Sequence, residues 1–496
     1  METFLELRPL WIVLLTPLTA VLIVLSHRRP NLREAWSVLA SCVQLVLVAS
    51  MIPEVLAGHR FEVTLLPLAS GFDLVLRADA LGMIFAGVAS ILWVATTFYS
   101  IGYMRALDEP HQTPYYASFA LCISSAMGIA FAGNPLTFFV FYEGLTLATY
   151  PLVVHKRSEE AIRVGRKYLA YTLSAGLCML LAIGWIQTFL PAHAFRAGGF
   201  LTPEMASPTS LKWIFLLFML GVGVKAGIMP LHAWLPAAMI APTPVSALLH
   251  AVAVVKAGVF GVIRVVYFVF GPKTLAALGL DGPLIGFAAF TIIVASIIAL
   301  SQDNLKRRLA YSTISQLSYI VLGAALLSRA GLLGAAMHIA NHAFMKITLF
   351  MCAGAVYAHL HVSKISEMKG IGRAMPFTMG AFAVAALAIA GTPPLPGFVT
   401  KWWLGQGAAQ SGHIVAIWIL IGSALLNALY FFPIIWTAFF RRSERFTAYN
   451  EGSLALVGPP IFTAACCFLL GMMPEFGPDF WDFAGRVVAS IFGGSP

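Results

Sequence analysis

The stretch GVGVKAGIMPLHAWLPAAMIAPTPV, residues 221–245, decides how the rest of the chain is interpreted. It continues an apolar run that begins at Leu211, and it places Lys225 where a membrane helix should carry only lipid-compatible side chains. Gly227 and Pro230 follow at once, and proline removes a backbone donor and clashes with the carbonyl four residues earlier. In a bilayer, such a break is tolerated only where protein or trapped water satisfies the freed backbone groups. A buried lysine beside a broken helix therefore indicates an ion path through a transporter.

The rest of the chain is also strongly apolar. Of its 496 residues, 59% are hydrophobic and 10% are charged, and the mean hydropathy is +0.86. A soluble protein carries about 25% charged residues, so this composition excludes a chain that is mainly a soluble domain. The net charge of +10 would suggest nucleic acid binding in a soluble protein. Here the basic residues lie in short loops between apolar runs, which indicates contact with a lipid bilayer and no nucleic acid partner.

The hydropathy pattern predicts an all-α polytopic membrane protein with about fourteen spans of about 20 residues each. The spans lie near residues 10–26, 35–57, 80–103, 114–133, 135–155, 166–189, 211–240, 243–270, 283–300, 308–327, 330–359, 375–410, 413–440 and 453–475. No positively charged region of a signal peptide precedes the first span, so we expect that span to be retained as a helix. The stretch 61–77 alternates enough to predict two short strands.

The basic residues divide unevenly between the two sides of these spans. Eighteen lie in the loops of one side and eight on the other. The positive-inside rule makes the richer side cytoplasmic, so we expect both termini outside, in the periplasm or at the cell exterior. Five basic residues remain inside spans: Lys225, Lys256, Arg264, Lys346 and Lys401. Arg264 lies toward the outer end of its span, where an arginine side chain can extend to the interface.

A second broken helix is predicted at AGTPPLPGFVTKWW, residues 390–403, where Pro393, Pro394 and Pro396 precede Lys401. Each break is in the fourth span of a five-helix block, 114–270 or 283–440. Adjacent blocks with an odd number of spans must have opposite orientations, which is the pattern of an inverted repeat. The three-helix segment 1–113, with its exterior hairpin, and the C-terminal helix within 441–496 are additions to this core.

Glu143 is the one acidic residue deep in a span, and it shares a block with Lys225. Burial disfavours the charge of both groups, whereas an approaching opposite charge favours it. A lysine whose counter-ion approaches and recedes can therefore take and release a proton. The alternative is a static ion pair that holds two helices in register, although buried ion pairs contribute little net stability.

A polar stripe is predicted on the eleventh span, where His338, His342 and Lys346 recur at intervals of four. Lys256 and His250 lie on the eighth span, and the tenth span offers the hydroxyls of Tyr311, Ser312, Ser315, Ser318 and Tyr319. With trapped water these groups could form a proton path at mid-membrane depth. The alternative for each histidine alone is a hydrogen-bonded interior residue.

The sequence offers little support for other chemistry. It contains no Walker A sequence, no HExxH and no CxxCH, and none of the six cysteines forms a CxxC pair. We therefore expect no metal site and no bound cofactor in this chain, and any electron transfer would belong to partner subunits.

Five stretches of the chain resemble the antiporter-like subunits of the respiratory complex I superfamily. They are FVFYEGLTLATYPLV (139–153), VGVKAGIMPLHAWLPAAMIAPTPVSALLHAVAVVKAG (222–258), DNLKRRLAYSTISQLSYI (303–320), HIANHAFMKITLF (338–350) and GTPPLPGFVTKWW (391–403). That superfamily includes membrane subunits of NADH–quinone oxidoreductase and of membrane-bound hydrogenases, and the D subunit of Mrp sodium/proton antiporters. HAFMKITLF and FVTKWW look most like the Mrp D type and the related hydrogenase subunits.

The resemblance implies fourteen helices with two discontinuous ones. It also implies roles for the residues that match: Glu143 and Lys225 as a modulating pair, Lys256 as the central relay, Lys401 as the terminal lysine, and His338, His342 and Lys346 as the connecting axis.

Two functions from different classes follow from the resemblance. The first is a subunit of a Na⁺/H⁺ antiporter in the bacterial cytoplasmic membrane, with other hydrophobic subunits as partners. The second is the proton-pumping membrane arm of a redox enzyme, such as a hydrogenase or a quinone reductase. A scaffold without transport is a third reading, but each lysine at mid-span costs at least ~3 kcal/mol. The identity of the subunits that copurify distinguishes the first two.

Overall fold

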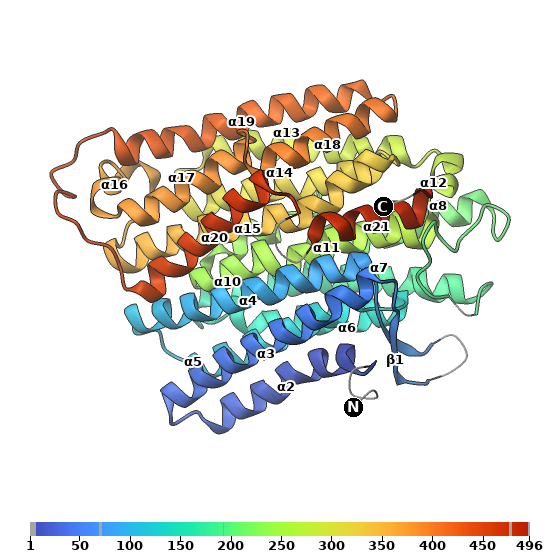
Figure 1. Ribbon diagram of the computed structural model, residues 1–496, viewed down its shortest axis with the longest axis horizontal. Coiled ribbons are helices and arrows are strands. Elements are labelled where there is room, and N and C mark those ends of the chain that lie inside the picture. The colour runs from blue at the N-terminus through green and yellow to red at the C-terminus, as the bar shows by residue number, and fades with distance from the viewer. Residues whose placement is uncertain (1–5, 69–71, 192, 476–478, 495–496) are drawn as a thin grey trace.

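The structure, a computed structural model, describes residues 6–68, 72–191, 193–475 and 479–494, and it consists of long helices that lie side by side (Figure 1). The chain begins with α2 (Arg8–Leu25), α3 (Pro30–Leu56), β1 (Phe61–Leu66), β2 (Leu74–Ala78) and α4 (Ala80–Ala106). A first block follows with α5 (Gln112–Ala130), α6 (Pro135–Val153), α7 (Glu159–Gln187), α8 (Pro208–Ala226), α9 (Trp234–Ala237), η1 (Ala238–Ile240), α10 (Thr243–Ala247), η2 (Leu248–Val252), α11 (Val254–Arg264) and η3 (Val265–Phe270).

The short helix α12 (Pro272–Leu278) leads into the second block. That block contains α13 (Asp281–Ser301), α14 (Leu305–Ala325), α15 (Arg329–Leu360), η4 (Ile365–Glu367), α16 (Ile371–Ala374), α17 (Pro376–Ala390), α18 (Pro396–Gln410) and α19 (Ile414–Phe439). The chain ends with α20 (Leu454–Met472) and α21 (Phe480–Phe492).

The protein is a multi-pass membrane protein. Among the described residues, 11 helices are long and apolar enough to cross a bilayer. The helices α5 and α14 have the required length but more polar side chains, and α17 and α18 form one crossing in two pieces. Together these elements give fourteen crossings, which confirms the predicted number, the two five-helix repeats and their broken helices.

The centre of the molecule is formed by the span from Thr243 to Phe270 and by α15. The first of these is wholly buried inside the protein, whereas most of α13 and α19 faces outward. Because lipid tails are as apolar as the side chains that contact them, an outward apolar surface needs no protein cover. The α15 helix packs against α10, α14, α18 and α20, and this packing brings the two blocks together.

The bundle has two ends. The terminal face carries the start of α2, the β-hairpin and α21, at the right of Figure 1. The loop face is the opposite end, with the start of α3, the end of α4 and the start of α5. The predicted strands are confirmed, since β1 pairs antiparallel with β2 and Phe61 lies opposite Ala78. The sequence predicted one helix after residue 440, and the structure adds the second, α21. This helix is too short to span and packs against α4 and α15.

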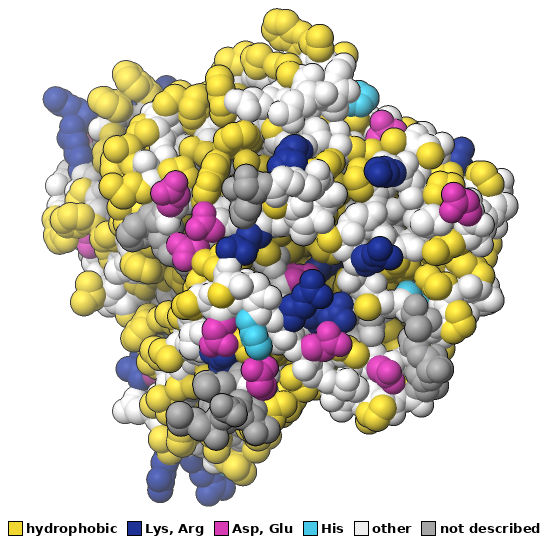
Figure 2. Space-filling model, turned by 45° about the vertical axis from the view of Figure 1, so that its right-hand side comes forward, with side chains coloured by type: hydrophobic (Ala, Val, Ile, Leu, Met, Phe, Trp, Pro, Cys, Tyr) yellow, Lys and Arg dark blue, Asp and Glu magenta, His cyan; other side chains and the backbone are white. Residues whose placement is uncertain are grey.

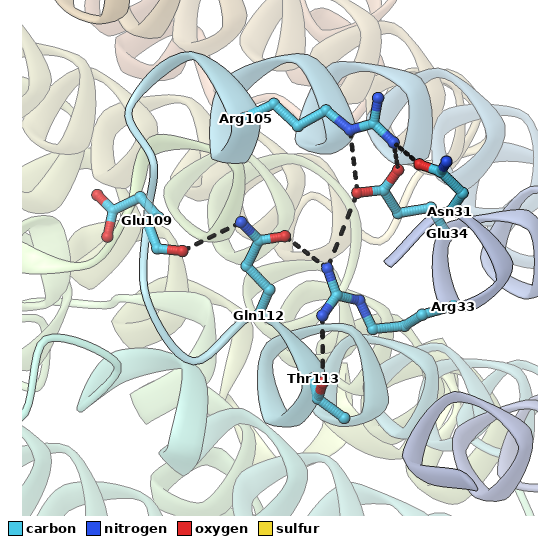
Figure 3. A network of polar contacts seen from close by, with 7 residues as sticks. All are labelled: Asn31, Arg33, Glu34, Arg105, Glu109, Gln112 and Thr113. Atoms are coloured by element: carbon cyan, nitrogen blue, oxygen red, sulfur yellow. Dashed lines mark hydrogen bonds and ion pairs between the residues drawn. The ribbon is translucent and has the colours of Figure 1, made fainter. Parts of the chain in front are cut away.

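A polar network ties three helix ends together at the loop face (Figure 3). Arg33, at the start of α3, donates to Gln112 Oε1 at 2.6 Å and to Thr113 Oγ1 at 3.2 Å, both on α5. Arg105, at the end of α4, pairs with Glu34. Glu109 lies in the loop after α4. His155, which follows α6, places its Nε2 3.7 Å from the Glu109 carboxylate and holds the pKa of that carboxyl below its usual range. The network fixes the loop-face ends of α3, α4 and α5 relative to one another.

Candidate functional site

The break after α8 is built by a glycine cap. Gly227 has a φ of 71°, a left-handed conformation that glycine adopts without a Cβ clash, and it ends α8 directly after the turn that holds Lys225. The N–H of Ile228 returns to Gly223 O at 3.1 Å. The chain then turns through Pro230 and resumes as α9. The backbone groups freed by the break are partly satisfied by side chains, since Trp234 Nε1 donates to Val224 O at 2.8 Å.

The second block repeats this design. Gly391, with a φ of 92°, ends α17, and the N–H of Thr392 returns to Leu387 O at 3.2 Å. Pro393 and Pro394 follow, and Pro396 is the first residue of α18, where a missing N–H leaves no helical bond unmade. Lys401 lies on α18 and donates to the carbonyls of Ile389 and Ala390 at 2.8 and 2.7 Å. Lys401 therefore binds the free carbonyls at the end of its own broken helix.

Lys225 is fully buried and contacts α6. Its ammonium donates to Tyr142 O and lies 3.4 Å from the centre of the Tyr142 ring, a cation–π contact. Glu143, the next residue on α6, interacts with Lys225 electrostatically but forms no ion pair with it. Both carboxylate oxygens of Glu143 lack a hydrogen-bond partner among the described residues. The predicted pair is thus close but separated, which is the arrangement that a movable counter-ion requires.

Lys256 is bound by the polar stripe on α15. Its Nζ lies 2.8 Å from His342 Nδ1, and both side chains have no exposed surface. The rings of His342 and His338 lie 5.5 Å apart, and His338 Nδ1 lies 3.0 Å from Thr400 Oγ1. The ring of Tyr319 lies 5.7 Å from the ring of His338 and 5.7 Å from Lys401 Nζ, so this line leads from Lys256 in the first block toward Lys401 in the second.

Lys346 starts a second line toward Lys401. Its Nζ donates to Ser312 Oγ at 2.7 Å, and the Tyr430 hydroxyl lies 3.0 Å from the same oxygen. That hydroxyl also bonds Asn427 Oδ1, and Asn427 Nδ2 donates at 3.3 Å to Ile389 O, the carbonyl that Lys401 also uses. A tyrosine has one hydroxyl hydrogen, so Tyr430 can give it either to Ser312 or to Asn427. A chain of hydrogen bonds thereby links the ammonium of Lys346 to the carbonyl that Lys401 binds.

Three of the predicted site residues form no hydrogen bond to either of these two lines. His250 is buried with both ring nitrogens unpaired among the described residues, and its ring lies 4.8 Å from that of Phe350. Ser315 bonds Ser296 Oγ at 2.9 Å, which joins α13 to α14 and reaches no lysine. Tyr311 is only half-buried, and its ring lies 6.3 Å from that of His232. The geometry thus places Ser312 in the polar lines but gives Ser315 and Tyr311 no bond to them.

Four residues of the site were missed by the sequence reasoning: Tyr142, Thr400, Asn427 and Tyr430. Tyr142 and Thr400 are direct neighbours of residues that were singled out. Asn427 and Tyr430 lie three residues apart in an otherwise apolar span, with Ser423 four residues earlier. Polar side chains at these intervals share one face of a helix, and that spacing is the signal that could have identified them.

Arg264 differs from its predicted position at the interface. It is 1% exposed and forms two parallel bonds to Asp79, at 2.5 and 2.8 Å, while Asp79 also caps the start of α4. The bidentate carboxylate gives both terminal nitrogens of the guanidinium a partner without water, so the side chain stays inside the protein.

The chemistry available to this arrangement is proton transfer. Lysine, histidine, serine and tyrosine can each give and accept a proton in turn, and all of those in the two lines except Lys401 are fully buried.

Residues 132–426 match the family described as "NADH:quinone oxidoreductase/Mrp antiporter, TM". The chain belongs to this family.

Relatives in the family include proteins of both functional classes. The chain is 33% identical over 388 residues to the N subunit of NADH-quinone oxidoreductase from Desulforudis audaxviator, covering 77% of this chain and 75% of the relative. It is 23% identical over 478 residues to the D subunit of the Na(+)/H(+) antiporter from Bacillus subtilis, covering 96% of each. The fold matches a chain of an archaeal membrane-bound sulfane sulfur reductase with a TM-score of 0.87 at 24% identity, over 97% of each chain.

Proposed function

We propose that this chain conducts protons within a multisubunit cation/proton antiporter, as a subunit of the Mrp D type. The observation that carries the proposal is the buried line from Lys256 through His342 and His338 to Tyr319, whose ring lies 5.7 Å from Lys401 Nζ. A charged lysine in the bilayer costs at least ~3 kcal/mol, so a function that needs it is the simplest reason to have four.

The cation is proposed from the relatives. The antiporter protein from Bacillus subtilis aligns with nearly the whole of this chain, and its name specifies Na⁺ and H⁺. We propose the bacterial cytoplasmic membrane as the location, with the loop face inside, because the basic loop residues gather on that face. Other hydrophobic subunits of the same complex would complete the antiporter.

A second candidate is the membrane arm of a redox-driven proton pump. It is favoured by the 33% identity with a subunit of NADH-quinone oxidoreductase. Purification of the native complex distinguishes the two candidates. Small hydrophobic subunits without redox centres support the antiporter, whereas iron–sulfur or nickel subunits support the pump.

Transport by the purified complex in vesicles tests the proton path. We expect Lys256→Ala to reduce Na⁺-driven proton movement, followed with a pH-sensitive dye, by about 100-fold or more, because a proton relay loses its acid–base group. Lys256→Arg should fail as well, since guanidinium stays protonated and cannot pass a proton on.

Lys212→Ala is the matched control, because Lys212 is exposed at the start of α8. If the Lys256 variants assemble and still transport at the native rate, the proposed path is wrong.

A further inference from the structure

A large pocket opens on the terminal face, away from the lysine lines. It has a volume of about 990 Å³ and is lined by the end of α3, the end of β2, the loop after α7, and α21. Figure 2 brings this face toward the viewer and shows Lys and Arg side chains gathered near its middle. Three of the lining arginines come from separate parts of the chain: Arg60 precedes β1, Arg196 follows α7 and Arg486 lies on α21. The fold thus brings distant basic residues to one pocket.

These three arginines differ from the other arginines at the terminal face, which all have an acceptor within the protein. Arg8 pairs with Glu54, Arg77 with Glu62 and Arg264 with Asp79, and Arg329 donates to the carbonyls of Phe492 and Gly493. The guanidinium groups of Arg60, Arg196 and Arg486 form no ion pair and no hydrogen bond with any described residue. The unpaired arginines of this face therefore all line the same pocket.

The acidic groups near the pocket do not compensate this charge. Among the described residues that line it, Asp79 is the one acid, and both of its carboxylate oxygens bond Arg264, at 2.5 and 2.8 Å. Arg77 also lines the pocket and is paired with Glu62 at 2.8 Å. Because each of these pairs is neutral, the lining keeps the positive charge of the three unpaired arginines.

Apolar side chains form part of the wall around these charges. Leu190, Phe200 and Phe268 line the pocket, and the two phenylalanines are buried. A cleft with charges of one sign and walls of low polarity focuses the electric field and raises the local concentration of the opposite charge. The pocket therefore attracts anions and disfavours cations.

We propose that this pocket binds an oxyanion of the phosphate class, either free or as the headgroup of an acidic phospholipid. The planar fork of a guanidinium matches the oxygens of a phosphate group, and three arginines from three chain segments offer such forks. The pocket is larger than a phosphate group, so it has room for the ester that carries one. The inference goes beyond the proposed function, because no lysine of the two proton lines borders the pocket.

Thiol labelling of the purified whole complex tests the site. In a background without native cysteines, Ser490→Cys places a thiol at the pocket, four residues after Arg486 on α21. Thr209→Cys is the matched control, because Thr209 is exposed at the start of α8 and does not line the pocket. The two reagents are sulfonatoethyl methanethiosulfonate, which is an anion, and trimethylammonioethyl methanethiosulfonate, which is a cation.

At low salt, we expect the ratio of anion to cation labelling rates to be at least about tenfold higher at Ser490→Cys than at Thr209→Cys, because the arginines concentrate the anion. Inorganic phosphate should slow the labelling of Ser490→Cys more than chloride of the same ionic strength does. In the triple variant Arg60→Gln/Arg196→Gln/Arg486→Gln, the same protection should require at least about tenfold more phosphate, because charge-assisted hydrogen bonds are lost.

Two lipid compositions distinguish the sources of the phosphate group. The complex is placed in nanodiscs of phosphatidylcholine with or without phosphatidylglycerol, and no phosphate is added. Protection of Ser490→Cys only in the discs with phosphatidylglycerol identifies the ligand as a lipid headgroup. Protection only by added inorganic phosphate identifies it as a free oxyanion. Either result supports the inference.

Arg163→Gln is the control for the triple variant, because Arg163 is an exposed arginine near the loop-face start of α7, and it should leave the protection unchanged. Protection by phosphate and lipid no greater than that by chloride, or protection that persists unchanged in the triple variant, would overturn the inference. A thiol at position 490 that neither reagent reaches in the whole complex would also overturn it, since a partner subunit would then cover the pocket. The readout needs no transport, so its failure is distinct from failure of the proposed function.

Discussion

Glu143 has room for its carboxylate because residue 176 has no side chain. Gly176 lies on α7 opposite Glu143, and a Cβ added there would be 2.3 Å from Glu143 Oε1. At the scale of single residues, the site thus depends on a small residue as much as on charged ones. The carboxylate is the end of a flexible side chain, so it can yield without a shift of the backbone.

We predict that Gly176→Ala displaces the Glu143 carboxylate and slows transport while the complex still assembles. A change of about 1 kcal/mol in its interaction with Lys225 would slow transport about fivefold. Initial rates of proton movement in vesicles measure the effect. Gly184→Ala, on the same helix with no heavy atom within 4 Å of the added Cβ, is the control. Equal losses in both variants, or loss of the assembled complex, would count against a role for the Glu143 position.

The two broken helices use the same local design despite their different sequences. Both end at a left-handed glycine, and in both the next N–H returns to the carbonyl five residues earlier. The hydrogen-bond partners of the two lysines differ. Lys225 donates to a carbonyl of another helix, α6, whereas Lys401 donates to carbonyls at the break of its own helix. At the scale of elements, the repeat therefore preserves the break and changes the group that each lysine contacts.

The break after α8 is held by close packing against α11. A Cβ added at Gly258 would lie 2.1 Å from Ala226 N and 2.4 Å from Lys225 C, both backbone atoms. We predict that Gly258→Ala forces the last turn of α8 away and lowers the stability of the protein by about 1–3 kcal/mol, the usual effect of overpacking. Thermal unfolding of the purified complex in detergent measures this.

Gly286→Ala on α13 is the control for that variant, because no heavy atom lies within 4 Å of its added Cβ. Alanine is the better helix former, so this control should unfold at the same or a higher temperature. Similar unfolding temperatures for the two variants would show that the contact at Gly258 is not tight.

At the scale of the whole molecule, the unequal distribution of basic residues predicts the orientation. Basic residues are concentrated at the loop face, and the positive-inside rule therefore predicts that this face is cytoplasmic. The network of Figure 3 shows that two of them, Arg33 and Arg105, also lock helix ends together. These two arginines therefore contribute to packing as well as to the predicted orientation.

We predict that a membrane-impermeant thiol reagent added to intact cells modifies Arg60→Cys and leaves Arg307→Cys unmodified. Both positions are exposed, one on each face. After the cells are opened, both should react. Reaction at 307 but not at 60 in intact cells would show that the orientation is the reverse of the predicted one.

The sequence alone determined the spans, the two breaks and the lysines, because hydropathy and proline are read along the chain and a charge within an apolar run stands out. It could not determine that Lys225 contacts Tyr142 and not Glu143, or that Tyr430 joins Ser312 to Asn427. Arg264 and Asp79 are 185 residues apart, and their pairing depends on how α4 and α11 are rotated against each other. Only the tertiary structure decided such contacts, because side-chain packing between helices sets that rotation and no local pattern encodes it.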